Sequence, residues 1–331
     1  MSKKIINRPE DCVAEAMEGF LYAHGRDYAQ VEGVSGLRVR EPKEKPALVV
    51  GGGSGHEPMF AYFVGENLAD ASAAGSVFTS PDPGTIVSTA LSVERGRGVL
   101  FVYGNYSGDN MNFDIAAELL GDMGVETRTV RVYDDVASAP RENREDRRGI
   151  AGNVLVIKIA GAATASGLTL DEAARVAAKA RDNVYSIGVG LSGATIPGED
   201  KPIFELNGDE MEYGLGIHGE PGIRRVKLMP ADQMVDELVR RILEDSGITC
   251  GDTVCTLVNG LGATTLLELN VINRRLAQIL EQKGIRVHAM EVGSLITSLE
   301  MAGASVTLMK LDGELQAYYD MPCASPYYQK R

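Results

Sequence analysis

The sequence is short of basic residues. Its 331 residues include 33 Lys and Arg against 46 Asp and Glu, which gives a net charge of −13. An acidic surface repels the phosphates of nucleic acids and of anionic membranes, so we expect neither as a partner. A bound phosphate would have to be held by local backbone donors or supplied by another protein.

Cysteine and long apolar segments are scarce too. The four cysteines, Cys12, Cys250, Cys255 and Cys323, form no CxxC pair and have no metal-ligand spacing with histidine, which argues against structural zinc. They are typical of reduced thiols in a cytoplasmic protein. No run of 18 apolar residues occurs, and the first residues lack the apolar core of a signal peptide. We therefore predict neither a membrane-spanning nor a secretory segment.

The chain nevertheless has the composition of a folded protein, with 44% hydrophobic residues. Its length suits two domains. Short apolar, β-branched runs alternate with helical patterns along the whole sequence, which is typical of α/β proteins. We predict two α/β domains, residues 1–182 and 183–331, each with a mostly parallel or mixed sheet flanked by helices.

The same patterns predict the individual elements. The predicted helices cover residues 9–24, 112–123, 231–245 and 263–283, with another that opens at a Thr169–Glu172 capping box and runs to about Arg181. The predicted strands cover 47–50, 98–103, 125–133, 184–189, 253–258 and 284–291, with a final pair near 305–319. Asn207-Gly208-Asp209 predicts a hairpin between 204–206 and 210–213. The charged stretch 137–149 is predicted to be a surface loop.

Two of the four histidines lie in glycine-bracketed loops, each followed closely by Glu-Pro. The loops read Gly55-His56-Glu57-Pro58 and Gly216-Ile217-His218-Gly219-Glu220-Pro221-Gly222. Glycine lets backbone approach a ligand closely, and histidine titrates near neutrality. The pattern favours a small-molecule site. The alternative is that each histidine only hydrogen-bonds its own loop.

The loop at 51–55 follows a predicted strand and lies where ligands of α/β sheets bind. It has neither GK[ST] nor a complete GxGxxG, so it is a weak nucleotide fingerprint. As a nest of backbone donors beside Ser54 and His56, with a helix expected to start at Glu57-Pro58, it suits a small polar ligand. Ser80, after another predicted strand, can add a hydroxyl.

Asp109 closes a second loop, at the end of the strand 98–103. It has two interpretations: a helix cap or a catalytic carboxylate. A metal centre built from His56, His218 and Asp109 is a third reading of the loops and would indicate a metal-dependent hydrolase or lyase. No HExxH or paired-ligand spacing supports it.

Five motifs together resemble the substrate-binding subunits of dihydroxyacetone kinases. They are GGGSGHEPMF at 51–60, FTSP at 78–81, GNYSGDNMNFD at 104–114, MEYGLGIHGEPGI at 211–223 and VNGLGATTLLEL at 258–269, and they cover nearly the whole chain in order. The resemblance implies a homodimer of two-domain α/β subunits that binds a short ketose and presents it for phosphorylation.

The resemblance also implies roles for individual residues. His218 would form a covalent hemiaminal with the ketose carbonyl, and His56 and Asp109 would contact its hydroxyls and transfer protons. The other expected substrate-binding residues are Gly53, Ser54, Gly55, Ser80 and Gly104. Gly104 departs from the family pattern, because well-studied members carry lysine there; the ketose could therefore be a tetrulose such as erythrulose.

No cofactor is expected on this chain, which ends at Arg331 without a nucleotide-binding domain. The resemblance places the nucleotide, ADP or ATP with magnesium, on a separate kinase subunit of the L type. In some members a phosphotransferase-system protein is the phosphodonor. A rival reading is a non-catalytic, ketose-sensing co-activator of the same family.

Overall fold

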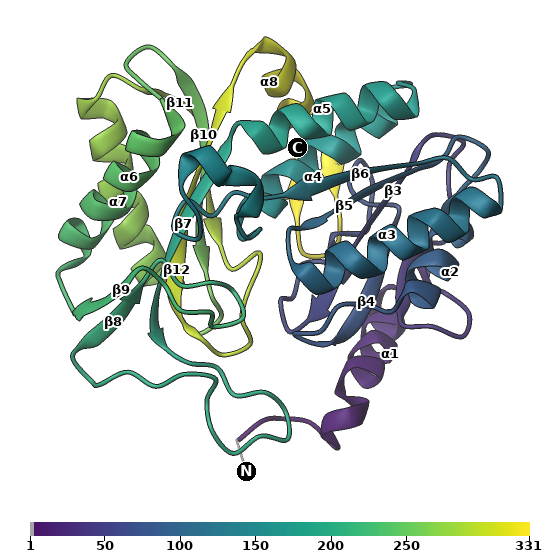
Figure 1. Cartoon of the computed structure of the whole chain (residues 1–331), viewed down its shortest axis with the longest axis horizontal. Coiled ribbons are helices and arrows are strands. Elements are labelled where there is room, and N and C mark those ends of the chain that lie inside the picture. Colours follow the sequence, from purple (N-terminus) through teal and green to yellow (C-terminus); the bar gives the residue numbers. More distant parts are fainter. Residues whose placement is uncertain (1–2) are drawn as a thin grey trace.

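Two six-stranded sheets form the framework of the protein. The computed structural model describes residues 3–331. In Figure 1 the first sheet lies on the right and the second on the left, with α4 between them. The predicted α/β class, with mixed sheets flanked by helices, is confirmed.

The first sheet has the strand order β1-β2-β4-β3-β5-β6. Its strands are β1 (Tyr28–Gln30), β2 (Gly36–Val39), β3 (Ala47–Ser54), β4 (Ala71–Val77), β5 (Val99–Gly104) and β6 (Thr127–Val132). The strands β4, β3, β5 and β6 are parallel to one another, and β2 runs antiparallel to both of its neighbours, β1 and β4. The helices α1 (Cys12–His24), α2 (Pro83–Val93) and α3 (Ser107–Asp122) belong to this half. The carboxyl ends of β3 and β5 therefore lie on the same edge, as expected for a ligand site.

The second sheet has the order β11-β10-β12-β7-β8-β9 and is mainly antiparallel, with β10 and β11 as its parallel pair. Its strands are β7 (Val184–Ser192), β8 (Glu210–Tyr213), β9 (Arg224–Lys227), β10 (Thr253–Gly260), β11 (Arg286–Gly293) and β12 (Ala302–Leu311). The helices α6 (Ala231–Ser246) and α7 (Leu266–Gln282) cover it. Both lie close to their predicted bounds, because each has one apolar stripe.

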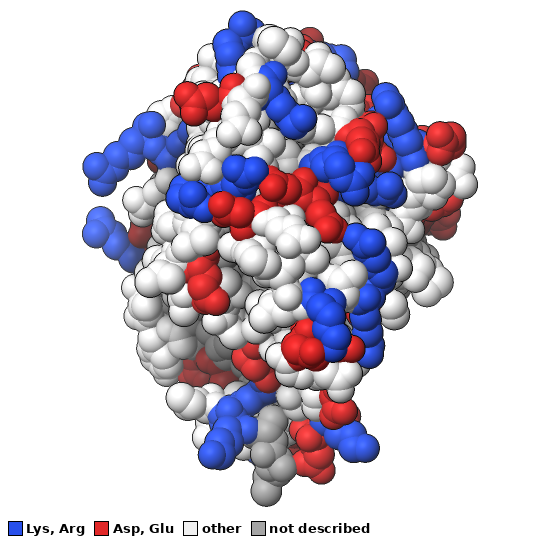
Figure 2. Space-filling model, turned by 90° about the vertical axis from the view of Figure 1, so that its left-hand side faces the viewer, with Lys and Arg blue, Asp and Glu red and all other residues white. Residues whose placement is uncertain are grey.

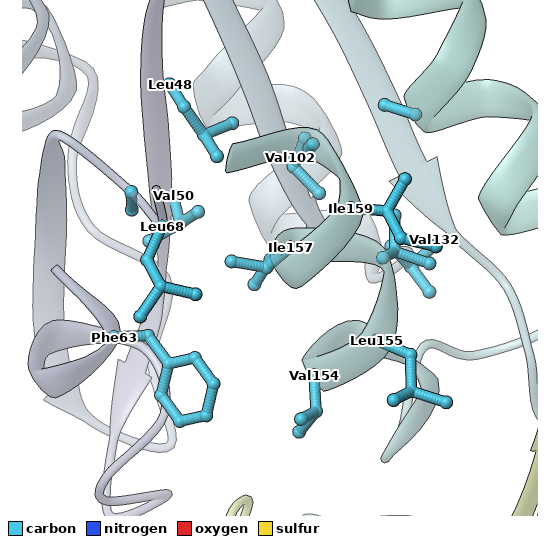
Figure 3. Packing of buried hydrophobic residues seen from close by; sticks show 14 of the residues in the cluster. Leu48, Val50, Phe63, Leu68, Val102, Val132, Val154, Leu155, Ile157 and Ile159 are labelled. Carbon is cyan, nitrogen blue, oxygen red and sulfur yellow. The ribbon is translucent and has the colours of Figure 1, made fainter. Parts of the chain in front are cut away.

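Helix α4 (Gly152–Ala165) is the central element of the core. Its residues 152–164 are all buried, and it packs against strands of both sheets. Figure 3 shows Val154 and Ile157 of α4 among side chains such as Leu48 and Val102 of the first sheet. The sequence patterns missed this helix, because a helix that is apolar all round has no amphipathic period. Helix α5 (Leu170–Asp182) packs on α4 and starts at the predicted Thr169–Glu172 capping box.

The C-terminal elements connect the two halves. Helix α8 (Gly313–Asp320) packs on α4, and the short strands β13 (Cys323–Ala324) and β14 (Gln329–Lys330) follow it. Ala324 bridges to Glu66 of the first half. The division at residues 182 and 183 into two domains stays a prediction.

Two predicted strand pairings are wrong. Residues 204–206 are not in a strand; β8 pairs with β9 and β7 instead. Asn207-Gly208-Asp209 still turns the chain, but Phe204 packs in a small apolar cluster. Of the pair expected near 305–319, β12 is a strand, whereas Asp312 caps α8 by accepting a hydrogen bond from Leu315 N at 2.9 Å.

The helix expected at Glu57-Pro58 is also not formed. Glu57 turns back instead, and its carboxylate accepts the Gly55 N–H at 3.0 Å. Turns and a 3-10 helix, η2 (Ala61–Phe63), follow. The charged stretch 137–149 is largely irregular, as expected, but contains a further 3-10 segment, η3 (Arg141–Asp146).

Charges of both signs are interleaved on the face formed by α6 and α7. Figure 2 shows this face, where Lys and Arg alternate with Asp and Glu. Several of them form ion pairs, such as Arg275 with Asp236 and Arg224 with Glu237. Over residues 3–331, none of the helices combines the length and the apolar character needed to cross a bilayer.

Candidate functional site

Three separate parts of the chain meet at the candidate site. His56 follows β3, Asp109 lies in the first turn of α3, and His218 lies in the connection between β8 and β9. The structure thus brings together the two histidine loops, which are 162 residues apart in sequence. Both sheets contribute, so the site lies between the two halves of the molecule.

The two histidines face each other directly. Their Nε2 atoms are 3.0 Å apart, and the two rings meet edge to face at 68°, with centroids 4.8 Å apart. The alternative that each histidine only bonds its own loop is therefore wrong. A carbon atom that bonds to His218 Nε2 must take the place of this contact.

His56 is almost completely buried, with 1% of its surface exposed. Its Nδ1 lies 2.7 Å from the carbonyl oxygen of Thr297. A carbonyl can only accept, so Nδ1 carries the proton and Nε2 keeps its lone pair. Burial, reinforced by the nearby His218, lowers the His56 pKa to about 3. His56 is therefore a neutral proton acceptor at physiological pH.

His218 is held by the glutamate of its own loop. Its Nδ1 lies 3.1 Å from Glu220 Oε1, and its backbone N–H donates to Glu220 Oε2 at 2.9 Å. Burial alone would raise the pKa of Glu220, but the hydrogen bond and charge of His218, together with Arg148, lower it to about 2. Glu220 is thus ionised beside His218.

A loop that the sequence reasoning missed joins the two histidine loops. Between β11 and β12, Thr297 accepts from His56, and Ser298 Oγ donates to the Ile217 carbonyl. Thr297 Oγ1 also donates to the Glu57 carbonyl at 2.9 Å. Neither residue stands in a glycine-rich or histidine-containing motif, so the sequence carries no signal for this role.

Two aromatic rings form the walls around the histidines. Phe78 stacks on His56 at 5.0 Å and meets His218 edge-on at 5.3 Å, while Tyr106 meets His218 edge-on at 4.7 Å. Phe78 has φ of 55°, in the left-handed region, which is costly for a bulky residue and is a feature of functional sites. These rings exclude water and lower the local polarity.

Asp109 is the third titratable group of the site. It is 9% exposed, and its Oδ1 has no hydrogen-bond partner among the residues that the structure describes. Burial raises its pKa to about 6, against the opposing effects of Ser80 and His218. The residue at the N-cap of α3 is Tyr106, so Asp109 is not the cap.

The remaining predicted binding residues surround this group. Gly53 lies where a Cβ would come within 2.7 Å of Thr79 N, and Gly55 has φ of +97°, so both positions require glycine. Ser54 Oγ donates to the Gly75 carbonyl at 2.7 Å, and the Ser54 carbonyl accepts the Phe78 N–H at 2.9 Å, so both groups are used within the fold. Ser80 Oγ accepts from Asn112 at 3.3 Å.

Gly104 does not border open space. A Cβ there would lie 3.3 Å from Asn153 Nδ2 and from the Gly149 carbonyl oxygen, and 3.4 Å from the Tyr106 ring. Position 104 is therefore closely packed on that side of the loop. Asn153 itself is fully buried, and its Oδ1 has no hydrogen-bond partner within the described residues.

The donor set of the site suits proton transfer and nucleophilic addition. Among residues 3–331, no three or more His, Cys, Asp or Glu side chains are grouped so that they could hold a metal ion. A neutral His56, a second imidazole 3.0 Å from it and a carboxyl with pKa about 6 are the groups expected for acid–base and covalent chemistry.

Known proteins resemble this chain over its whole length. It is 43% identical, over 99% of both chains, to the PTS-dependent dihydroxyacetone kinase 2, dihydroxyacetone-binding subunit DhaK, of Listeria innocua. It is 41% identical to the L-erythrulose 1-kinase of Mycolicibacterium smegmatis, over 98% of this chain and 58% of that protein.

Solved structures agree with these relatives. The dihydroxyacetone kinase of C. freundii in complex with AMP-PNP and Mg²⁺ superimposes with a TM-score of 0.92 at 28% identity, over 100% of this chain and 61% of that one. The dihydroxyacetone kinase operon co-activator Dha-DhaQ superimposes with a TM-score of 0.90 at 30% identity, over 96% of this chain and 98% of that one. The Dak1 domain model matches residues 18–327. The chain therefore belongs to the Dak1 domain family.

Proposed function

We propose that this chain is the ketose-binding subunit of a dihydroxyacetone kinase or a closely related short-chain ketose kinase. It holds the ketose as a hemiaminal on His218 while a terminal hydroxyl is phosphorylated. The observation that carries the proposal is the pair of Nε2 atoms 3.0 Å apart, beside a carboxyl whose pKa is about 6. The 43% identical relative is named as a dihydroxyacetone-binding subunit, which supports the same function.

The covalent step selects carbonyl compounds. The lone pair of His218 Nε2 bonds to the ketose C2, the electron pair of the C=O π bond moves to oxygen, and that oxygen takes up a proton. Glycerol and other polyols have no carbonyl and are rejected chemically rather than by size. The adduct also fixes the substrate in one position, which is most of what phosphoryl transfer requires of an enzyme.

His56 and Asp109 are the proposed proton-transfer groups. His56 Nε2 is an acceptor, because its Nδ1 donates to Thr297. It can take the proton of the terminal hydroxyl as that oxygen attacks phosphorus. Asp109, with a pKa of about 6, can supply a proton to the former carbonyl oxygen and recover it when the adduct breaks down. Gly53, Gly55 and Ser80 complete the proposed binding loops.

We also propose that the phosphoryl donor is held by a partner. The nucleotide, ADP or ATP with magnesium, would be bound by an L-type kinase subunit, and a phosphotransferase-system protein is the proposed phosphodonor where that nucleotide is ADP. The relative named as PTS-dependent supports this arrangement. A homodimer in the cytoplasm is the proposed state, and the four free cysteine thiols fit a reducing compartment.

A tetrulose is the second candidate substrate. It is favoured by the 41% identity to an L-erythrulose 1-kinase. The co-activator similarity gives a third, non-catalytic reading. Turnover separates that reading from the first two, since a sensor binds ketose without phosphorylating it.

Intact-protein mass spectrometry tests the proposal. The protein is mixed with dihydroxyacetone, L-erythrulose or glycerol, desalted rapidly and weighed. We expect a mass increase with the two ketoses and none with glycerol. Phosphorylation is then assayed with and without the L-type subunit from the Listeria system, with ATP or with the phosphotransferase components. Absence of any ketose adduct refutes the proposed function; adduct formation without turnover with any partner favours the co-activator.

A further inference from the structure

Glu220 uses both of its carboxylate oxygens on His218. Oε2 accepts the backbone N–H of His218 at 2.9 Å, and Oε1 lies 3.1 Å from the ring Nδ1. The loop folds back to allow this, with Gly219 at φ of +83° and the Gly216 N–H donating to the Glu220 carbonyl at 3.1 Å. One side chain therefore holds both the backbone and the ring of the same residue.

Two acceptors face the ring nitrogens of His218: Glu220 Oε1 lies 3.1 Å from Nδ1, and His56 Nε2 lies 3.0 Å from Nε2. An ionised carboxylate can only accept, so the bond to Glu220 requires hydrogen on Nδ1. In the cationic ring a second proton on Nε2 makes the hydrogen bond to His56. In the neutral ring the charge-assisted bond to Glu220 is the stronger of the two, so Nδ1 keeps its proton and Nε2 has the lone pair. The other charged or titratable groups near the ring, Arg148, Asp109 and Tyr106, make no hydrogen bond to Nδ1. The choice between the two nitrogens depends on Glu220.

We propose that Glu220 is the positioning residue that holds His218 as the Nδ1–H tautomer and thereby makes Nε2 the nucleophile toward the ketose carbonyl. This inference rests on the proposed function, and it gives Glu220 a second role in the covalent step. When Nε2 bonds to carbon, the ring retains its Nδ1 proton and becomes cationic, and the carbonyl oxygen gains an electron pair and then a proton. The Glu220 carboxylate, 3.1 Å away, compensates the new positive charge. A buried aspartate acts on the histidine of the Ser-His-Asp triad in the same way.

The competing explanation is that Glu220 only shapes its loop through the backbone contact. Glu220→Gln separates the two roles, because glutamine has one acceptor oxygen where the carboxylate has two. The backbone N–H can only donate, so the amide oxygen must face it. The NH₂ group then faces Nδ1, which has to become an acceptor, and the ring proton moves to Nε2. The loop is kept while the tautomer is reversed.

Glu212 provides a matched control. It is a buried glutamate of β8 whose Oε1 accepts the Gly222 N–H at 2.9 Å and whose Oε2 accepts from Arg225 at 3.0 Å. It therefore anchors the same loop without touching the His218 ring. Glu212→Gln keeps the acceptor for Gly222 and should leave the tautomer and the adduct unchanged.

The tautomer is read from the ring ¹⁵N chemical shifts of histidine-labelled protein without ketose, with His218 assigned by comparison with His218→Ala. In the wild type we expect the neutral ring to carry its proton on Nδ1, and in Glu220→Gln on Nε2. The initial rate of adduct formation with dihydroxyacetone should fall about 10²–10⁴-fold in Glu220→Gln, and Glu220→Asp, which keeps both acceptors, should recover part of it.

A wild-type ring with its proton on Nε2 overturns the inference without any variant, so the test holds even if Glu220→Gln does not fold. An adduct rate in folded Glu220→Gln equal to that of Glu212→Gln overturns it as well. Either result leaves the proposed function standing, as long as the wild type forms the adduct. A wild type that forms no adduct refutes the proposed function while leaving the tautomer measurement valid.

Discussion

We expect the buried carboxylate of Asp109 to lower the free energy of unfolding of the protein. Its burial raises the carboxyl pKa from an ordinary value of 3.8 to about 6. Below pH 3.8 the group is protonated in both the folded and the unfolded state and has no effect. As the pH rises, the unfolded carboxyl ionises first, so the free energy of unfolding falls. Above about pH 6 the penalty is constant at about 3 kcal/mol.

Asp109→Asn removes this penalty at nearly constant size. Asparagine adds an N–H donor that needs a partner, which offsets part of the gain, so we expect a net stabilisation of about 1–3 kcal/mol at pH 7.5. The change of this stabilisation with pH is a more specific test than its size at one pH. From the two pKa values, the stabilisation relative to the wild type should shrink by about 2 kcal/mol between pH 7.5 and pH 4.5, whatever the amide costs.

Urea unfolding of the wild type, Asp109→Asn and Asp114→Asn at the two pH values measures this difference. Asp114 lies on the same helix but is exposed and pairs with Arg131, so its substitution should change stability by at most about 1 kcal/mol. Other titrating groups cancel between variants. A stabilisation by Asp109→Asn that is equal at both pH values would falsify the argument that the buried carboxylate carries the cost. Turnover with the partner should fall about 10²–10⁴-fold.

Three further substitutions test the site. His218→Ala should abolish the ketose mass adduct and leave the circular dichroism spectrum intact, because His218 lies in a loop; a persisting adduct contradicts the assignment. His56→Asn should still form the adduct but lose about 10²–10⁴-fold in kcat with the partner subunit, and a near wild-type kcat would make His56 a structural residue. Gly104→Lys should lower kcat/KM for erythrulose relative to dihydroxyacetone by about 10–200-fold, the usual range for one added group in a pocket. An unchanged ratio means that position 104 does not set specificity.

Features that depend on neighbouring residues were predictable from the sequence. The Thr169–Glu172 capping box, the helix at 231–245 and the strand at 98–103 all follow from local hydrogen bonds or side-chain period. The residues of the histidine loops and Asp109 could be singled out for the same reason. The strand–helix alternation was enough for the α/β class. The strand predicted at 47–50, however, continues to Ser54, through glycines that were expected in the loop.

Features that depend on distant partners were decided by the tertiary structure. The pairing of β8 with β9 rather than with residues 204–206 and the burial of α4 on all sides depend on what packs against them. So does the contact between His56 and Thr297, which are 241 residues apart. The sequence placed His56, His218 and Asp109 in glycine-rich loops, and the packing of the two sheets brought them together. That packing also excluded water around them, which is why His56 has a pKa near 3 and Asp109 one near 6.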